Sequence, residues 1–189
     1  MTEKTQKFIE DYLDLIDQNR WSEIQPKAFA VLGDLYHEFN AVMLNAGINP
    51  MIDTPMIPWK SMQYCPVEKY DIPSSIKVIG GRAFQYAGFP EIIIPEGVEE
   101  INFRAFSECA RLHTVYLPST IKKLDGAIFM HCPKLEKIVY NGSSVDFENI
   151  EKSVADSPFT WFTVATDLSN VKCKVICSDR NILIGAFRR

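Results

Sequence analysis

The stretch that decides the fold reads IPEGVEEINFRAF at residues 94–106, because two other stretches repeat its pattern. Residues 72–84 read IPSSIKVIGGRAF, and residues 117–129 read LPSTIKKLDGAIF. Each stretch carries a proline at its second position and a phenylalanine at its end: Pro73, Pro95 and Pro118, then Phe84, Phe106 and Phe129. Both series have spacings of 22 and 23 residues. A fixed period of this length indicates stacked structural repeats.

Each repeat is predicted to contain a short strand, a turn that carries the phenylalanine, and a longer strand. Extended apolar segments follow the turns at residues 91–94, 114–117 and 137–140. One unit cannot bury its apolar side alone, so neighbouring units must stack to form a continuous core. Two ladders of equivalent residues are expected in that core: Ile79, Ile101 and Leu124, and Phe84, Phe106 and Phe129. The longer strands then form a parallel sheet with strands about 4.8 Å apart.

This pattern resembles the BspA-like leucine-rich repeats, whose units run Ile-Pro, a Val or Ile, an Ile-Gly turn, Ala-Phe, a Cys, then Leu and a strand. The match covers about residues 57–150. It departs from the pattern at Ile128, where Ala is usual, and by one residue near Phe89. The resemblance implies an α+β fold, a short right-handed leucine-rich-repeat solenoid of about three full repeats plus a partial one. The partial repeat is expected near Cys65–Tyr70, which echoes residues 132–138.

Residues 1–56 are predicted to form a helical N-terminal segment that caps the first rung. Apolar residues recur at helical spacing over residues 5–19 and 32–43, which predicts a helical hairpin. Ser22 is a plausible N-cap of the second helix, Pro26 requires a place in its first turn, and Gly47 is a good stop. A separate partner-binding helical head is the alternative.

The C-terminal residues 151–189 are predicted to close the other end of the solenoid. Residues 171–177 and 182–184 are apolar runs on either side of a polar turn, which is typical of a β-hairpin. A solenoid needs such a cap because an open end exposes both core and strand edge.

Composition and charge narrow the classes of partner. The net charge is −4 with both signs interspersed, so no basic footprint for nucleic acid is present. No apolar run reaches the roughly 20 residues that cross a bilayer, and residues 1–10 are polar. We therefore expect no nucleic-acid partner, no membrane, and a cytoplasmic location, which is the host cytoplasm if the chain is phage-encoded. A secreted or surface location would require a leader that has been removed.

The cysteines and histidines do not form a pattern typical of a reactive site. Five cysteines are an odd number without close metal-type pairs, which indicates reduced thiols. Cys109 and Cys132 share one repeat position, so a disulfide between neighbouring rungs is geometrically possible, but a small residue filling a core slot is the simpler interpretation. Zinc binding by these cysteines with His113 and His131 matches no usual ligand spacing. No catalytic, cofactor-binding or metal-binding residues are predicted, and the chain is not expected to be an enzyme.

The outer face of the longer strands is the predicted binding surface. If Val115 and Leu117 point inward, then Ile93, Tyr116 and Val139 form an outward apolar column. Its predicted flanks are polar: Glu91, Thr114, Lys137, His113 and Glu136. An exposed apolar column with a polar rim is typical of a partner-binding patch. The alternative is that residues 158–162 or the N-terminal helices cover it.

These features predict a protein–protein interaction module of unknown partner, without a cofactor. Three other functions stay open. Short repeats of this type behind a helical segment are similar to small proteins of bacteriophages and mobile elements, which implies a virion component or an inhibitor of a host defence enzyme. Many BspA-like proteins are surface adhesins. An enzyme would require a cleft between the helices and the first rung that holds ionisable side chains.

Overall fold

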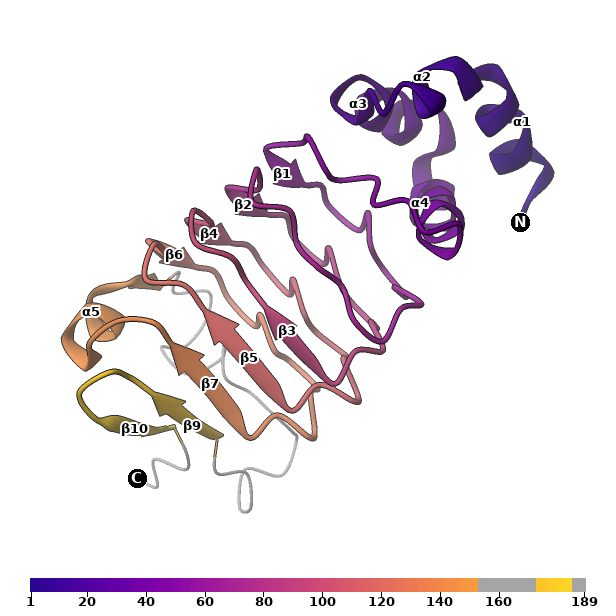
Figure 1. Ribbon diagram of the computed structural model, residues 1–189. Coiled ribbons are helices and arrows are strands. Elements are labelled where there is room, and N and C mark those ends of the chain that lie inside the picture. Colours follow the sequence, from indigo (N-terminus) through magenta and orange to yellow (C-terminus); the bar gives the residue numbers. More distant parts are fainter. Residues whose placement is uncertain (153–172, 185–189) are drawn as a thin grey trace.

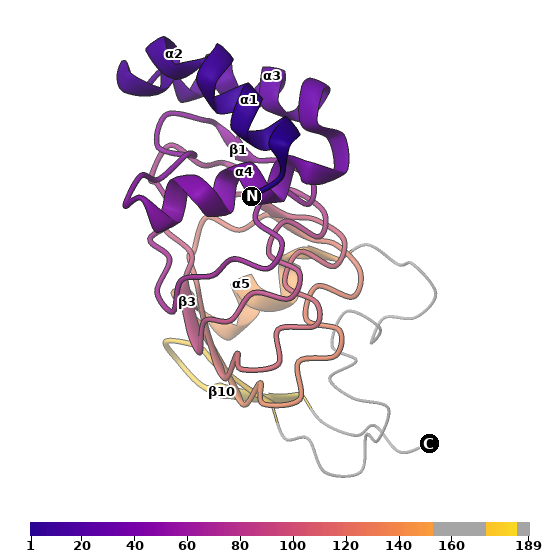
Figure 2. The ribbon, with the colours of Figure 1, turned by 90° about the vertical axis from the view of Figure 1, so that its right-hand side faces the viewer.

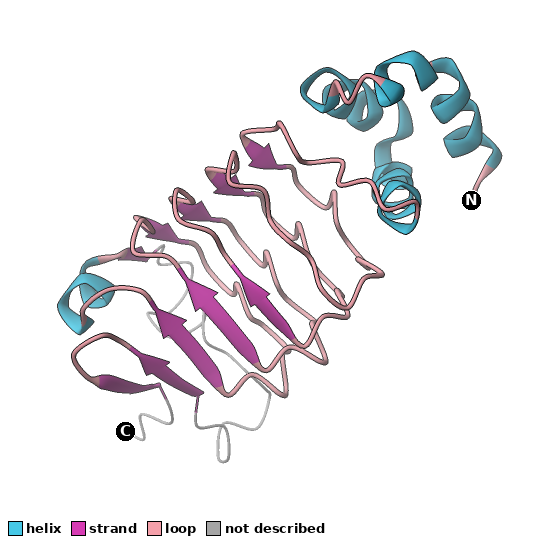
Figure 3. Cartoon of the chain, in the orientation of Figure 1, coloured by secondary structure: helices cyan, strands magenta, loops and turns pink. Residues whose placement is uncertain are grey.

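The computed structural model describes residues 1–152 and 173–184 of the chain. It is a solenoid whose rungs stack along one axis, with a group of helices at the N-terminal end (Figure 1). Short strands form one side of the solenoid and longer strands form another, and turns connect them (Figure 3). The leucine-rich-repeat solenoid predicted from the sequence is therefore confirmed.

The short strands form a parallel five-stranded sheet in the order β1-β2-β4-β6-β8. Their bounds are β1 Met56–Ile57, β2 Val78–Ile79, β4 Glu100–Ile101, β6 Lys123–Leu124 and β8 Glu151–Lys152. Directly before β4 and β6, residues of opposite charge occupy equivalent positions on neighbouring rungs. The Lys122 ammonium lies 2.8 Å from the Glu99 carboxylate on the preceding rung. That ion pair joins neighbouring rungs, and opposite charges side by side favour this register.

The longer strands form the second sheet, in the order β10-β9-β7-β5-β3. Their bounds are β3 Glu91–Ile93, β5 Thr114–Leu117, β7 Lys137–Tyr140, β9 Cys173–Ile176 and β10 Asn181–Ile184. Neighbours from β3 to β9 run parallel, whereas β10 pairs antiparallel with β9. The predicted closing hairpin is confirmed, and its first strand also continues the solenoid sheet.

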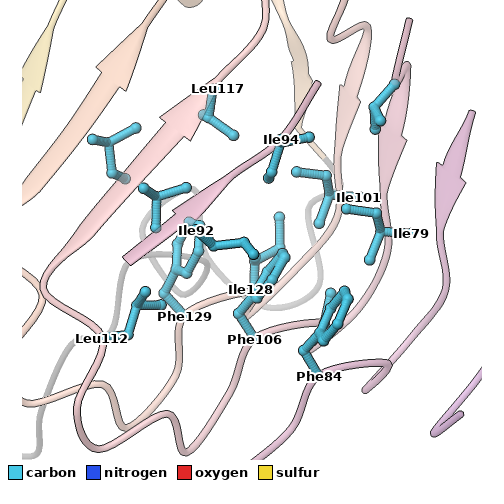
Figure 4. Close-up of a cluster of buried hydrophobic side chains, with 14 of the residues drawn as sticks. Ile79, Phe84, Ile92, Ile94, Ile101, Phe106, Leu112, Leu117, Ile128 and Phe129 are labelled. Carbon is cyan, nitrogen blue, oxygen red and sulfur yellow. The ribbon is translucent and has the colours of Figure 1, made fainter. Parts of the chain in front are cut away.

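The core lies between the two sheets and consists of the expected ladders (Figure 4). Ile79, Ile101 and Leu124 are direct neighbours in the strand register. The Phe106 ring stacks between two equivalent rings, with centroids 5.2 Å from Phe84 and 5.8 Å from Phe129. Stacking identical apolar positions in this way buries a surface that no single rung could bury.

The first rung begins earlier than the partial repeat at Cys65–Tyr70. Strand β1 pairs with β2, and the Met62 amide donates to the Ala83 carbonyl at 2.9 Å. Met62 is 1% exposed and occupies the place that phenylalanine takes in later rungs. Gly80 is required at the next rung, because a Cβ there would lie 2.6 Å from the Ile57 carbonyl oxygen.

The N-terminal helices are shorter than the sequence predicts. They are α1 Glu3–Asp11, α2 Leu13–Asp17, α3 Trp21–Leu32 and α4 Tyr36–Asn45, with a 3-10 turn, η1, at Gly33–Leu35. The two long helices of the predicted hairpin are therefore each divided. Gly33 ends α3 in a left-handed conformation with φ of 59°, a region that favours glycine.

Two details of the predicted helix ends are wrong, and one is supported. Helix α3 begins at Trp21, so Ser22 is not its N-cap; instead the Ser22 amide donates to the Asp53 carboxylate at 3.0 Å. Pro26 is the sixth residue of α3 and lies beyond the first turn. Gly47 follows α4 with φ of 78°, and the Ile48 amide donates to the Met43 carbonyl, which closes the helix as expected.

The helices rest on the first rung of the solenoid (Figure 2). Their own core includes Trp21, Ile24 and Phe39. At the junction, the buried Asn40 side chain donates to the Ser61 carbonyl at 2.8 Å and accepts from the Gln25 amide at 3.1 Å. The helical segment is thus attached to the repeats by satisfied buried polar groups as well as by apolar contacts.

The other end of the described solenoid carries one short helix. Helix α5, Ser144–Asn149, has a capping box in which the Ser143 and Asp146 side chains each accept from the other's backbone amide. None of the helices in residues 1–152 and 173–184 is long and apolar enough to cross a membrane.

Candidate partner-binding face

The register of the longer strands places the predicted apolar column as expected. Ile93 is the neighbour of Tyr116, and Tyr116 is the neighbour of Val139. The next neighbour in this row is Ile176 on β9, which the sequence prediction did not include. Ile93 is 58% exposed, and the other three side chains are half-buried. The apolar column, defined as Ile93, Tyr116, Val139 and Ile176, therefore crosses four parallel strands.

The apolar column lies at the side of a shallow groove of about 440 Å³. The opposite wall comes from residues at the carboxyl ends of the same strands: Pro95, Glu96, Pro118, Asn141, Cys177 and Ser178. The Glu96 carboxylate accepts hydrogen bonds from the Asn141 side chain at 2.7 Å and the Ser119 amide at 3.1 Å. These bonds, with that of Asn141 the strongest, hold the pKa of Glu96 below its usual range. The rim of the groove therefore carries a fixed negative charge.

Four of the five predicted flanking residues are exposed, and one is not. Glu91, Lys137, His113 and Glu136 are solvent-exposed. Thr114 is only 6% exposed, so its place in the exposed rim was predicted wrongly. It is a short side chain between the longer Glu91 and Lys137, and its hydroxyl lies 2.9 Å from Nδ1 of His113.

The structure adds a second lysine to this rim. Lys174 on β9 is the direct neighbour of Lys137 on β7, and both are exposed. A break in the period hid both Lys174 and Ile176, because residues 141–172 separate β9 from the preceding long strand. The similar segments KIVY at 137–140 and KVIC at 174–177, which align in the observed register, were a weak signal of this extra rung.

The N-terminal helices do not cover the face. They stack beyond β1, at the end of the solenoid, while the column lies on β3, β5, β7 and β9 (Figure 1). The other predicted cover, residues 158–162, lies outside the described residues.

The cysteines occupy core positions. All five thiols are free and buried. The Cys109 thiol donates to the Phe84 carbonyl at 3.2 Å, and the Cys132 thiol donates to the Phe106 carbonyl at 3.1 Å. Each thiol thus contacts the preceding rung, as expected of a small residue that fills a core slot. Within the part of the chain that the structure describes, no three His, Cys, Asp or Glu side chains gather as a metal site would require.

A hollow of about 200 Å³ lies between the helices and the first rung, where an enzyme would need a cleft. Asp34, His37 and Lys60 line it together with aromatic side chains. In the described residues, no hydrogen bond or ion pair links these three ionisable groups. The arrangement therefore lacks the paired nucleophile and base that covalent catalysis uses.

Comparison with known proteins places the repeats in a family. A family model described as "BspA type Leucine rich repeat region (6 copies)" matches residues 56–176. This match begins at β1 and ends at β9, so it extends past residue 150. No curated protein matches the chain.

Two solved structures are similar over part of the chain. A leucine-rich repeat protein from Bacteroides ovatus is 36% identical, with a TM-score of 0.40, over 44% of this chain and 22% of its own. A leucine rich cell surface protein from Faecalibacterium prausnitzii is 24% identical, with a TM-score of 0.41, over 51% of this chain and 32% of its own. The match thus spans a third or less of each of these proteins. The repeat pattern, the stacked core ladders and the family match over most of the chain agree, and the chain belongs to the BspA-type leucine-rich repeat family.

Proposed function

We propose that the protein is a non-catalytic module that binds another protein through the face of its longer strands. The observation that carries this proposal is the apolar column, which crosses four strands with Ile93 more than half exposed. Apolar side chains in a continuous row, with charges at their edges, have the composition of a binding patch. Leucine-rich repeat proteins in general bind other proteins, which supports the same conclusion.

The groove beside the column adds specificity. A partner that buries the column must also meet the Glu96 carboxylate on one side and the Lys137 and Lys174 ammonium groups on the other. We therefore expect a partner with an apolar ridge, a hydrogen-bond donor or cation on one flank, and carboxylates on the opposite flank.

Charged substitutions within the column test this proposal. Tyr116→Asp and Ile93→Asp are expected to weaken binding more than tenfold, because each places a carboxylate in a desolvated apolar contact. The measurement is capture of partners from lysate of the native host with wild-type protein, followed by titration calorimetry of each captured protein against the variants. Val145→Asp is a matched control, since Val145 is 57% exposed on α5, away from the face. Equal affinity of all variants for every captured protein would refute the assignment of this face.

The biological setting remains a prediction from the family resemblance. An inhibitor of a host defence enzyme, a virion component and a surface adhesin all use a binding face of this kind, and a cytoplasmic location fits only the first two. Expression early in an infection cycle would favour an inhibitor, expression late would favour a virion component, and surface labelling of intact cells would favour an adhesin.

A further inference from the structure

A second surface lies on the turns that follow the short strands. Lys60, Arg82 and Arg104 occupy the same position in three successive rungs. Their backbone amides donate to carbonyls of the next rung, those of Gly81, Phe103 and Gly126, at 3.2, 2.9 and 3.1 Å respectively. All three have left-handed backbones, with φ of 57°, 54° and 56°. Three cationic side chains therefore leave equivalent points of the backbone, one rung or about 4.8 Å apart.

The described residues supply no counter-charge to this row of cations. Among residues 1–152 and 173–184, no carboxylate lies within ion-pair distance of any of the three. Nε of Arg104 is buried without a hydrogen-bond partner. By contrast, Glu99 and Lys122 form an ion pair between neighbouring rungs. Charges on successive rungs are thus paired in that row and not in the row of cations. Neighbouring like charges repel each other, which favours an anionic partner for the row.

Exposed aromatic side chains lie beside the cations. Trp59 is 47% exposed and Phe103 is 38% exposed. The Lys60 ammonium lies 4.3 Å from the Trp59 ring centroid, and the Arg104 guanidinium carbon lies 5.1 Å from that of Phe103. Gly81 separates the two rings along the row, and a Cβ at this position would lie 3.3 Å from Cδ1 of Trp59. Trp and Arg are the residues that most often dominate the binding energy of protein interfaces.

The row ends at the hollow between the helices and the first rung. Trp59 and Lys60 line this hollow together with Phe29, which is 46% exposed. The Asp34 carboxylate is also part of the lining, so an anion is less favourable there than beside the arginines. The hollow of about 200 Å³ is large enough for one apolar side chain.

We propose that this surface, the turn face of Trp59, Lys60, Arg82, Phe103 and Arg104, binds an acidic helical segment of a partner protein. The cation row spans two rung spacings, about 9.6 Å. Carboxylates at positions i, i+4 and i+7 of a helix span about 10.5 Å on one face, which matches the row. An apolar side chain one turn away would enter the hollow beside Trp59. The turn face shares no residue with the apolar column, so the two surfaces can be tested separately.

A protein partner fits the observations better than a single-stranded nucleic acid. The chain has a net charge of −4, so long-range electrostatics oppose the approach of a polyanion. Nucleic-acid grooves usually combine many cations with open aromatic faces. Here there are three cations in the row, and Lys60 and Arg104 already lie near the two aromatic rings.

The test uses a fluorescein-labelled 18-residue helical peptide with Glu at i, i+4 and i+7 and one Leu a turn away. The control peptide has Gln in place of each Glu. A 12-nucleotide thymidine oligonucleotide serves as the nucleic-acid probe. Fluorescence anisotropy is expected to show at least tenfold tighter binding of the Glu peptide than of the Gln peptide, weakening as salt rises from 50 to 300 mM. Equal binding of both peptides, or tighter binding of the oligonucleotide than of the Glu peptide, would overturn the proposal.

Three double variants separate the charge of this site from folding and from net charge. Arg82→Asn with Arg104→Asn removes the charge but suits the left-handed backbone, because asparagine tolerates this region. It is expected to keep the thermal midpoint and lose at least tenfold in affinity for the Glu peptide. Arg82→Glu with Arg104→Glu should abolish that binding. Lys4→Glu with Lys134→Glu is the control, because it changes the net charge by the same amount at two exposed sites elsewhere. It should reduce the affinity for the Glu peptide less than threefold. Equal losses in the two Glu double variants would show that only net charge matters and would refute the site.

Discussion

At the scale of single residues, burial determines the chemistry of the thiols. Burial raises the pKa of the Cys65 thiol to about 11 and that of Cys173 to about 12. The pKa of Cys109 is raised as well, first by its interaction with the neighbouring Cys132 thiol and then by burial. Thiolates are the reactive form of cysteine, so these side chains act as small core residues and are not poised for redox chemistry.

The same shifts predict a loss of stability in alkaline solution. An unfolded cysteine begins to ionise near pH 9, whereas Cys65 and Cys173 in the folded protein stay protonated to about pH 11 or 12. Above pH 9 the unfolded state therefore binds fewer protons, and the free energy of unfolding falls as the pH rises. We expect a loss of about 1 kcal/mol for each of Cys65 and Cys173 between pH 9 and 10, because one pKa unit corresponds to about 1.4 kcal/mol and the unfolded thiol is already partly ionised at pH 9. Urea denaturation at pH 8, 9 and 10 measures this slope.

Cys65→Ala supplies the control for that experiment. Ala87 occupies the equivalent slot of the next rung and is buried, so alanine fits this position. The variant should reduce the slope between pH 9 and 10 while it leaves that between pH 6 and 8 unchanged. Above pH 10, ionisation of tyrosine adds to the effect, because burial also raises the pKa of Tyr36 and Tyr70. A wild-type free energy of unfolding that is constant from pH 8 to 10 would contradict this account.

At the scale of elements, the phenylalanine ladder is the feature that holds the rungs together. Phe106→Ala is expected to reduce the free energy of unfolding by about 3–5 kcal/mol, because it opens a cavity in a close-packed core. Phe106 is 0% exposed and stacks on an aromatic ring from each neighbouring rung. Phe103→Ala is the matched control; it removes the same ring from the surface and should cost less than about 1 kcal/mol. Chemical denaturation of both variants measures the difference, and equal losses would show that the ladder is not the main source of stability.

The elements also show where sequence pattern is informative. The register of the rungs could be predicted because Phe84, Phe106 and Phe129 must align if each rung is to bury its apolar side. A single alignment does this for all rungs. The first rung was harder to predict, since Met62 replaces phenylalanine there. The pair Gln63 and Tyr64 recurs 22 residues later at 85–86, and this was the usable signal. The division of α3 from α4 at Gly33 had a weaker signal, because a single glycine within a helical pattern is often tolerated.

At the scale of the whole molecule, the binding surfaces were only partly predictable. The apolar column follows from strand alternation, which places Ile93, Tyr116 and Val139 on one side once the inner side is known. The burial of Thr114 depends on the lengths of its neighbours' side chains, which alternation does not describe. The turn face was not predicted, because a row of cations becomes visible only when left-handed turns bring Lys60, Arg82 and Arg104 into one line.

The junction between the helices and the repeats leads to a prediction about how the molecule unfolds. Asn40→Ala removes the hydrogen bonds that the Asn40 side chain makes with the Ser61 carbonyl and with the Gln25 side-chain amide. We expect the free energy of unfolding to fall by about 1–3 kcal/mol. In a solenoid each rung contacts only its neighbours, so destabilisation should decay along the array. Hydrogen exchange is expected to quicken most in α3, α4 and the first rung, and least in β7. Asn45→Ala, at the exposed end of the same helix, should leave exchange unchanged. A uniform increase across all rungs would show instead that helices and repeats unfold as a single cooperative unit.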